Sequence, residues 1–566
     1  MADTKISAAT LTTPQTTDLI PLARGGSSVA RHATVAAIVQ AQAASTTAVG
    51  SVELATAAET QAGTSSTLAV TPAGYSGAFL ASLGIYGLAF DYYVDSVGGD
   101  DTNSGTTVAS PLKTIAALTA KGISAGDRIG LKRGSHWDES LVVAAANIEV
   151  RAYGRGAKPV LDCSEAVENA YFSKTSGRAN VYEAAVTIES GVTTWVSAWE
   201  DDTRLTRAAT LAACDTTAGS YYPSSDSTDN IKLYIHATDS SSVITNGKVY
   251  EYSKRQNGFY SRTVEGVIVE NIHTRRNLQN DGSLAIGPNS AAYGCVATEG
   301  TKHNILCGTG CYLYECDAID AYYGSDYYTL FVANEDTPAY EGVIFEKCRA
   351  ILNQYEGLYS TGIYGHYNTS GGFGTIKVVD CEIRNCSTGS SFTNFDYLIY
   401  ERCKFDNNAY DIAYSQAAKI DIIDCQDNND RHSGNFINGS VDGATILIRG
   451  LRSRAIDCTP SQGILLFVRS GTYTVRNCSF RIEKAADSTN VMWIENAGAV
   501  ISATYNVYDV PNNATGYIYA NISGTLTSDY NHYFQTSRLF FQGGTGYANL
   551  AAWQAASSQD ANSTSG

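Results

Sequence analysis

The chain has 566 residues and a formal net charge of −17, and 44 % of its residues are apolar. This apolar fraction excludes an intrinsically disordered chain, and the acidic balance argues against nucleic acid or an anionic membrane surface as a partner. With 51 Gly and 37 Tyr but only 17 % charged residues, the composition is typical of a β-rich, turn-rich protein.

The N-terminal segment differs in character from the rest of the chain. Its first aromatic residue is Tyr75, and no Cys precedes that point. Such a segment cannot build a large core alone, so we expect it to fold by associating with other chains. Residues 32–44 (HATVAAIVQAQAA) suit either a short helix or a linker. No stretch approaches the roughly 20 apolar residues of a membrane span, and the start lacks a secretion-signal pattern.

The chain changes at Asp91, where a short strand leads into a loop rich in Gly, Asp and Asn. Ser110 followed by Pro111 predicts a helix start, with Ser110 as the N-cap and Pro111 at the first helical position. Two short strands broken at Gly134 should follow.

The acids of this loop leave two interpretations open. Asp100, Asp101 and Asn103 could hold Ca²⁺, or they could form a solvated turn, and we favour the turn. No CxxC pair with a matching second pair occurs, so we predict neither a metal site nor a cofactor.

Cysteines mark a repeat in the second half of the chain. The steps between them are 33, 22, 22, 33 and 20 residues, and a period near 22 made of short strands and turns predicts the coils of a parallel β-helix. Because equivalent residues of successive coils stack about 4.8 Å apart, we expect the thiols to form an interior ladder. The repeated runs are FEKC at Cys348, VVDC at Cys381, YERC at Cys403, IIDC at Cys425, AIDC at Cys458 and VRNC at Cys478.

Four runs of residues resemble two known kinds of protein. Residues 46–74 resemble an element of bacteriophage tail fibre proteins (GSVELATAAETQAGT…AVTPAG), and residues 5–24 are similar to the segment that attaches phage tail proteins to the virion. The run from Tyr92 to Ile115 (YYVDSVGGDDTNSGT…SPLKTI) resembles the opening of right-handed parallel β-helix proteins of the pectate-lyase-like kind. The run from Gly546 to Ser563 is similar to a segment near their C-terminus. The chain thus resembles a phage tailspike or tail fibre.

The resemblance implies an all-β protein whose main part is a right-handed parallel β-helix. Its expected divisions are a virion-attachment segment (1–45), a connecting element (46–90) and the β-helix with Tyr-rich insertions (91–566). It also implies a homotrimer, assembled in the host cytoplasm and attached through its N-terminus to a phage tail or baseplate protein. Such proteins act at the bacterial cell surface, where they bind and often cleave host polysaccharide.

The Tyr-rich insertions are the expected binding surface. Eleven Tyr occur between residues 312 and 367, and loops inserted in a solenoid gather on one face. Tyrosine suits sugars because its ring covers C–H faces while its hydroxyl forms hydrogen bonds. The alternative is that these Tyr residues only decorate strands. The predicted substrate-binding residues are Tyr322, Tyr323, Tyr359, Tyr364, His366, Glu335 and Asp336.

Glycoside hydrolysis requires two carboxyl groups, and stacked coils can supply either the retaining or the inverting separation. The runs DAIDAYY, EGLYS and YDIAYS look like one strand in successive coils. On that alignment the predicted catalytic acids are Asp320, Glu356 and Asp411, with Glu356 the best single candidate. Each could instead be an ordinary turn residue.

Two other functions remain open. A polysaccharide lyase would use a Tyr, His or Lys base, for which His366 near Tyr364 or the Arg431–His432 pair is suited. A non-catalytic receptor-binding fibre would bind the same glycan without cutting it. An endo-glycosidase is the preferred prediction.

Overall fold

The computed structural model describes residues 90–566, apart from several segments, together with the backbone of two short strands nearer the N-terminus. The chain divides into two compact units, residues 1–89 and 90–566. In the first, β1 (Leu19–Leu22) pairs antiparallel with β2 (Arg31–Thr34), so the start of the possible helix at 32–44 is a strand. The remainder of 1–89 lies outside the described residues, as do 190–195, 226–229, 279–280, 322–327, 335–341, 354–359, 367–373, 416, 430–435, 440–442, 456–463, 469–470, 483–489, 495–497, 510–516, 521–523, 535–539, 543–544 and 548.

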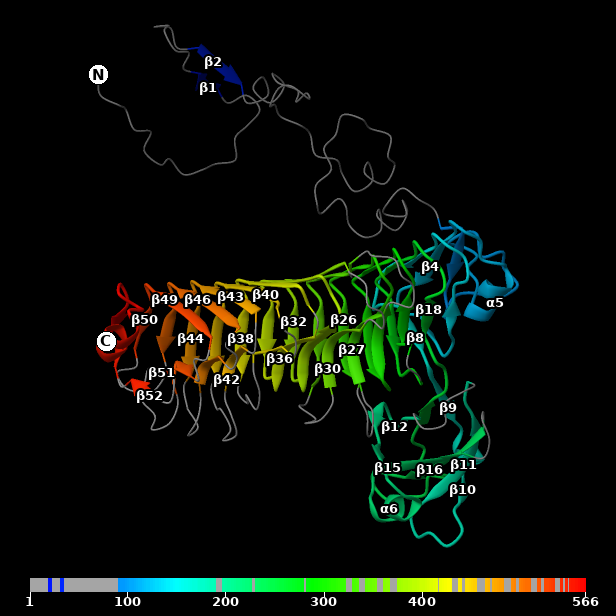
Figure 1. The fold of residues 1–566 in the computed structure, drawn as a ribbon. Coiled ribbons are helices and arrows are strands. Elements are labelled where there is room, and N and C mark those ends of the chain that lie inside the picture. The colour runs from blue at the N-terminus through cyan, green and yellow to red at the C-terminus, as the bar shows by residue number, and fades with distance from the viewer. Residues whose placement is uncertain are drawn as a thin grey trace. The chain divides into compact units, whose positions relative to one another are not determined.

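Residues 90–566 form a right-handed parallel β-helix, as the sequence predicted (Figure 1). Each regular coil gives one strand to each of three 14-stranded sheets, here called sheets 1, 2 and 3. All neighbouring strands in these sheets are parallel except one pair at the C-terminal end of sheet 3. No helix in the described part of the chain is long and apolar enough to cross a membrane.

Sheet 1 carries the candidate site on its outer face. Its strands alternate, so that Phe345 is buried in the core while Ile344 and Glu346 on either side are half-buried. In spatial order the strands are β3 (Tyr92–Val94), β4 (Arg128–Lys132), β7 (Glu149–Tyr153), β19 (Ile268–Glu270), β22 (Ala291–Tyr293), β25 (Tyr312–Tyr314), β28 (Ile344–Glu346), β31 (Thr375–Val379), β34 (Tyr397–Glu401), β37 (Lys419–Ile423), β40 (Thr445–Arg449), β43 (Gly471–Arg476), β46 (Ala499–Thr504) and β49 (Thr525–Asp529).

Sheet 2 follows sheet 1 after a tight corner in each coil, and its outer face carries many opposite charges on neighbouring strands. Arg349 binds Asp317 and Lys404 binds Glu382 in this way. Its strands are β5 (His136–Trp137), β8 (Val160–Asp162), β20 (His273–Arg275), β23 (Val296–Gly300), β26 (Asp317–Ala321), β29 (Arg349–Ile351), β32 (Glu382–Arg384), β35 (Lys404–Asp406), β38 (Gln426–Asn429), β41 (Arg452–Ala455), β44 (Ser479–Ile482), β47 (Val507–Asp509), β50 (His532–Tyr533) and β53 (Thr564–Ser565).

Sheet 3 completes each coil. Its strands are β6 (Leu141–Val142), β18 (Phe259–Ser261), β21 (Leu284–Ile286), β24 (His303–Cys307), β27 (Tyr328–Asn334), β30 (Ser360–His366), β33 (Thr388–Thr393), β36 (Tyr410–Ser415), β39 (Ile437–Gly439), β42 (Ile464–Val468), β45 (Asn490–Ile494), β48 (Tyr519–Ala520), β51 (Phe540–Gln542) and β52 (Thr545–Tyr547).

The interior cysteine ladder is confirmed, with one correction. The ladder cysteines are buried at the corner between sheets 1 and 2, where Glu382 N donates to Cys348 O and Lys404 N to Cys381 O. After Cys425 the next position is filled by Leu451, whose carbonyl accepts from Ser479 N. The alignment of Cys458 with the ladder is therefore wrong, and Cys458 itself lies outside the described residues. Toward the N-terminus the ladder continues through Cys316 and Cys295.

A left-handed residue stands immediately before each ladder position and makes the corner tight. Most of these residues are not glycine, which is unusual for positive φ angles. Their backbone N–H groups bind carbonyls of the next coil, except at Tyr530, whose N–H donates to Asp529 Oδ1. They are Asn271, Gly294, Glu315, Lys347, Asp380, Arg402, Asp424, Gly450, Asn477, Tyr505 and Tyr530.

The N-terminal end begins with a helix that starts later than predicted. Helix α5 (Ile115–Ala120) has Thr114 as its N-cap, with Thr114 Oγ1 accepting from Ala117 N at 3.0 Å. The predicted start at Ser110 is wrong because Leu112 N donates to Tyr93 O at 2.9 Å, which holds this stretch against β3. Asp101 Oδ1 accepts from the backbone N–H groups of Lys113 and Thr114, each at 2.9 Å. The loop acids therefore act as turn and helix caps.

A small β domain that the sequence analysis did not anticipate is inserted between β8 and β18 (Figure 1). It has its own apolar core, which includes Leu233 and Ile235. Its four-stranded sheet contains β13 (Thr203–Arg204), β12 (Ala198–Glu200), β17 (Tyr250–Ser253) and β9 (Ser164–Val167). Its five-stranded sheet contains β10 (Ser173–Lys174), β11 (Tyr182–Thr187), β16 (Asn230–His236), β15 (Ser220–Ser225) and β14 (Thr206–Arg207), and the helical segments are η1 (Asn169–Tyr171) and α6 (Leu211–Thr216).

The C-terminal end is closed by α7 (Leu550–Ser557). Trp553 on this helix stacks on Phe540 with ring centroids 4.4 Å apart, and its indole N–H donates to the buried Asp560 at 3.0 Å. Trp553 and Asp560 both belong to the C-terminal run that resembles a segment of other β-helix proteins, and in this chain they close the last coil.

Candidate functional site

A groove of about 480 Å³ lies on the outer face of sheet 1. It crosses four neighbouring strands, β25, β28, β31 and β34, and therefore extends about 14 Å along the axis of the β-helix. Its apolar lining is Ile344, Val379 and Ile399, and its polar lining is Tyr312, Glu346, Lys377 and Glu401.

Tyrosines border the groove at the β25 end. The Tyr312 ring centroid lies 5.9 Å from that of Tyr293 and 6.1 Å from that of Tyr314. The Tyr312 hydroxyl donates to Glu346 Oε2 at 2.7 Å, and burial together with this hydrogen bond raises the pKa of Tyr312. The site thus combines aromatic and aliphatic surface with polar groups, a combination that suits a sugar ring.

The two glutamates of the groove stand in one register. Glu346 pairs with Val379, which pairs with Glu401, so the glutamates are separated by two strand spacings, or about 9.6 Å. Arg402 Nη1 lies 3.2 Å from Glu401 Oε2, and the same guanidinium binds Asp380 through two hydrogen bonds. This backbone spacing is close to the carboxyl separation of about 6.5 to 9.5 Å found in inverting glycosidases.

A cation lies between the two glutamates along the axis. Lys377 is aligned with Ile344 on one side and Ile399 on the other. Within the described residues its ammonium group has no hydrogen-bond or ion-pair partner. It is therefore available to a ligand in the groove.

The sequence-predicted acids do not share one strand. Asp320 lies in β26 of sheet 2, whereas Asp411 lies in β36 of sheet 3, so the alignment of DAIDAYY with YDIAYS is wrong. Asp320 is buried at the end of its strand and accepts from Asn353 N at 2.7 Å. Asp411 is fully buried and accepts from Asn408 Nδ2 at 3.0 Å. Their catalytic role stays a prediction.

Of the predicted binding residues, the structure describes Tyr364 and His366, and both lie in β30 of sheet 3, away from the groove on sheet 1. Tyr364 in β30 is half-buried and packs against a small apolar cluster that contains Leu306 and Val332, and burial raises its pKa. His366 is the last residue of β30. The other predicted residues fall outside the described residues, and they are Glu356, Tyr322, Tyr323, Tyr359, Glu335 and Asp336.

The sequence contains a signal for the groove glutamates that the predicted site did not include. FEKC and YERC each place a glutamate two residues before a ladder cysteine, Cys348 or Cys403, and VVDC lies between them. Since the ladder fixes the register, this spacing puts Glu346 and Glu401 in line on the outer face of sheet 1.

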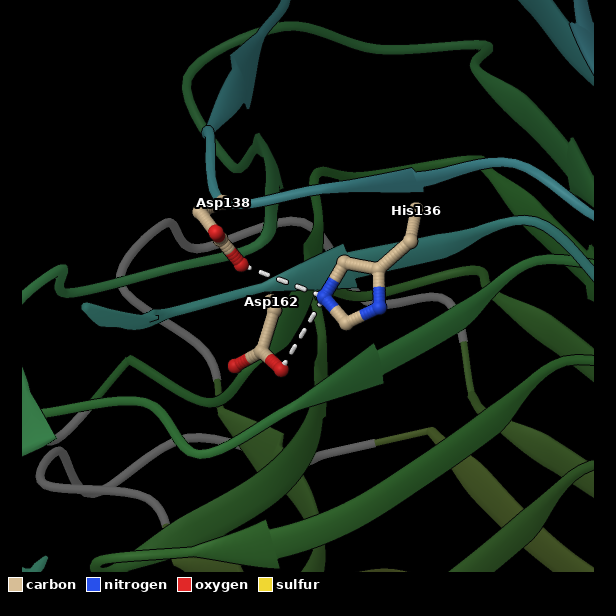
Figure 2. A group of neighbouring side chains, drawn as sticks. All are labelled: His136, Asp138 and Asp162. Atoms are coloured by element: carbon tan, nitrogen blue, oxygen red, sulfur yellow. Dashed lines mark hydrogen bonds and ion pairs between the residues drawn. The ribbon is translucent and has the colours of Figure 1, made fainter. Parts of the chain in front are cut away.

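A second group of polar side chains lies at the first strands of sheet 2. His136 Nε2 is 3.1 Å from Asp138 Oδ1 and 3.3 Å from Asp162 Oδ2, so these three side chains converge (Figure 2). They could offer three metal ligands. However, Arg275 Nε also binds Asp162 Oδ2, so a metal ion would face competing positive charge. We interpret the group as an ion-pair network.

This network predicts a pH dependence of stability. The hydrogen bonds to Asp138 and Asp162 raise the pKa of His136 to about 9 from its usual 6.5. Because the folded-state value is the higher one, the stabilisation is complete below about pH 6.5 and is lost as the pH rises through about 9. Between pH 6 and pH 10, we expect the melting temperature of the native protein to fall. The melting temperature of His136→Gln should fall less over the same range. A difference between the two proteins that is constant over this range would contradict the assignment.

We compared the sequence and the fold of this chain with those of known proteins. No protein-family model matches the chain, and no curated protein sequence matches it significantly. The structure of XylC with xylose has a TM-score of 0.50 and 10 % identity over 84 % of this chain and 85 % of that chain. Pectate lyase Pel9A has a TM-score of 0.36 and 12 % identity over 73 % and 77 % of the two chains. The tailspike protein gp49 of Pseudomonas phage LKA1 has a TM-score of 0.32 and 12 % identity over 78 % and 77 %.

At these identities the likeness concerns the fold alone. The chain is a parallel β-helix protein, and the predicted fold is confirmed by its three parallel sheets and by the likeness of its fold to XylC.

Proposed function

We propose that this protein is a bacteriophage tailspike that binds and cleaves a host surface polysaccharide as an endo-glycosidase. The observation that carries the proposal is the groove on sheet 1, where Tyr312 and an apolar floor lie beside two carboxylates. The likeness of residues 5–24 and 46–74 to phage tail proteins supports a place on the virion. The proposal includes a homotrimer, assembled in the host cytoplasm and attached to the tail or baseplate through the N-terminus.

A non-catalytic receptor-binding fibre is the second candidate function. A glycosidase needs one carboxyl group that stays protonated, which requires a raised pKa. Among the described residues, each carboxyl group with a shifted pKa has it lowered, as at Asp162, Glu200 and Asp380. Such a fibre would bind glycan in the same groove without hydrolysing it.

The test is incubation of the purified full-length protein with capsular polysaccharide or O-antigen from candidate hosts. We expect shorter polymer chains with new reducing ends. Shortening accompanied by the absorbance of an unsaturated uronate would indicate a lyase instead. Binding without shortening, on a host that the phage infects, would establish the non-catalytic fibre.

Catalysis by Glu356, assisted by Asp320 and Asp411, remains the sequence-derived assignment. If it holds, Glu356→Ala abolishes cleavage in this assay while glycan binding is retained. Unchanged cleavage would remove Glu356 from the mechanism.

A further inference from the structure

We propose that Glu401 and Glu346 are the general acid and the general base of an inverting hydrolysis in the groove on sheet 1. This inference rests on the proposed function and competes with Glu356 for the catalytic role. It gives the reaction a definite stereochemical outcome, which the sequence analysis left open.

The separation of the two glutamate backbones follows from the register. Two strand spacings place the backbones of Glu346 and Glu401 about 9.6 Å apart. Val379 lies between them in the same register, so the side chain between the two glutamates is small and apolar. An inverting enzyme needs this wider gap because a water molecule must fit beside the sugar, opposite the leaving group.

The surroundings of the two carboxylates differ and assign their roles. Glu346 accepts a hydrogen bond from the Tyr312 hydroxyl at 2.7 Å, which holds one carboxylate oxygen in place and suits a base that must meet an aligned water molecule. Glu401 lies between Val379 and Ile423, and Arg402 Nη1 lies 3.2 Å from its Oε2 while the same guanidinium makes two hydrogen bonds to Asp380. In the proposed complex, the bound sugar separates Glu401 from Arg402, which stays paired with Asp380, and covers the Glu401 carboxyl group among apolar side chains. Desolvation of a carboxyl group favours its protonated form, which suits an acid.

The reaction balances with these two groups and water. The Glu401 carboxyl donates its proton to the glycosidic oxygen as the bond from that oxygen to the anomeric carbon breaks. A water oxygen forms the new bond to the anomeric carbon from the opposite face, and Glu346 takes the water proton. The product then carries the inverted anomeric configuration, and proton exchange with solvent restores both groups. Lys377, which lies between the two glutamates, would bind a sugar oxygen.

The experiment compares Glu346→Gln and Glu401→Gln with the native protein on a bacterial polysaccharide that the native protein cleaves. Each substitution keeps the shape of the side chain, and melting temperatures check that the fold is intact. We expect each variant to lose cleavage by about 100-fold or more while it still binds the polymer. Glu315→Gln, at an exposed corner outside the groove, is the matched control and should cleave at the native rate.

Two further measurements separate the roles. On an aryl glycoside whose leaving group needs no protonation, Glu401→Gln should regain activity and Glu346→Gln should not. Added azide should restore turnover to Glu346→Gln, because the anion replaces the activated water. Proton NMR of the first native product should show the inverted anomer.

The outcomes that overturn the inference are distinct from those that overturn the function. No cleavage of any host polysaccharide by the native protein overturns the glycosidase function and the inference together. Three results overturn the inference alone, given that the native protein cleaves the polymer. Glu346→Gln and Glu401→Gln could both cleave at the native rate, or cleavage could be lost only in Glu356→Gln. The native product could also have the retained anomeric configuration.

Discussion

Replacing Arg276 with Met should destabilise the protein by about 3 to 5 kcal/mol, the usual cost of breaking a buried ion pair. Arg276 is only 1 % exposed, and its guanidinium forms hydrogen bonds with three carboxylates. It donates to Glu299 at 2.8 Å, to Glu251 at 2.7 Å and to Asp202 at 2.7 Å. The indole ring of Trp199 lies 4.5 Å from the guanidinium carbon.

The position of this network makes the effect large. Glu251, Asp202 and Trp199 belong to the inserted domain, whereas Arg276 and Glu299 belong to the β-helix. The substitution therefore leaves acids without their cation and also loosens the inserted domain from the first coils. We expect a lower urea midpoint and faster proteolysis within the inserted domain.

The matched control for Arg276 is an exposed arginine in a similar ion pair. Arg349 binds Asp317 through two hydrogen bonds, but its side chain is 49 % exposed. Arg349→Met should cost about 1 kcal/mol or less, because solvent already screens the pair. If Arg276→Met and Arg349→Met lowered the free energy of unfolding equally, the buried network would stabilise the protein no more than a surface salt bridge does.

Replacing Asp560 with Asn should destabilise the C-terminal coils by about 2 to 3 kcal/mol. Asp560 is fully buried and accepts hydrogen bonds from Ser563 Oγ at 2.6 Å, the Tyr533 hydroxyl at 2.9 Å and Trp553 Nε1 at 3.0 Å. Asparagine tolerates the left-handed backbone at this position (φ 56°), so the change tests the acceptor and not the turn. Its amide N–H₂ would face donors, and an unsatisfied buried donor costs about 1 to 3 kcal/mol.

Loss of this cap should expose the edges of the last strands. Unpaired strand edges promote association between molecules, so we expect aggregation on mild heating together with faster hydrogen exchange in the last two coils. Asp509→Asn is the control, because the Asp509 side chain is 49 % exposed and only approaches Arg481 at 3.6 Å. A native-like melting curve for Asp560→Asn would contradict the proposed role of Asp560 in stabilising the C-terminal coils.

The fold was largely predictable because its determinants repeat along the chain. Each coil contains the same short strands and the same tight corner, so cysteines such as Cys381, Cys403 and Cys425 reported a period that the structure confirms. The prediction was wrong at Cys458, because the ladder position after Cys425 comes 26 residues later and is filled by Leu451. A cysteine alone does not identify its place in a coil.

The inserted domain and the helix start show the limits of local patterns. The β-strands of residues 164–253 have ordinary composition, and nothing in their spacing marks that they leave one coil and return to the next. Ser110 and Pro111 have good helix-start chemistry, but pairing of Leu112 with β3 outweighs that preference. Hydrogen bonds to a neighbouring coil commonly override an intrinsic preference of less than about 1 kcal/mol.

By itself, the sequence determined the class of fold, the interior position of its regular cysteines and the resemblance of its ends to phage tail and β-helix proteins. Only the tertiary structure decided which side chains share a face. Insertions of different lengths hide the phase of the repeat, so Asp320 and Asp411 belong to different sheets despite their similar runs. Glu346 and Glu401 are 55 positions apart in the chain, yet lie in one register, because lateral hydrogen bonding between coils sets their spacing.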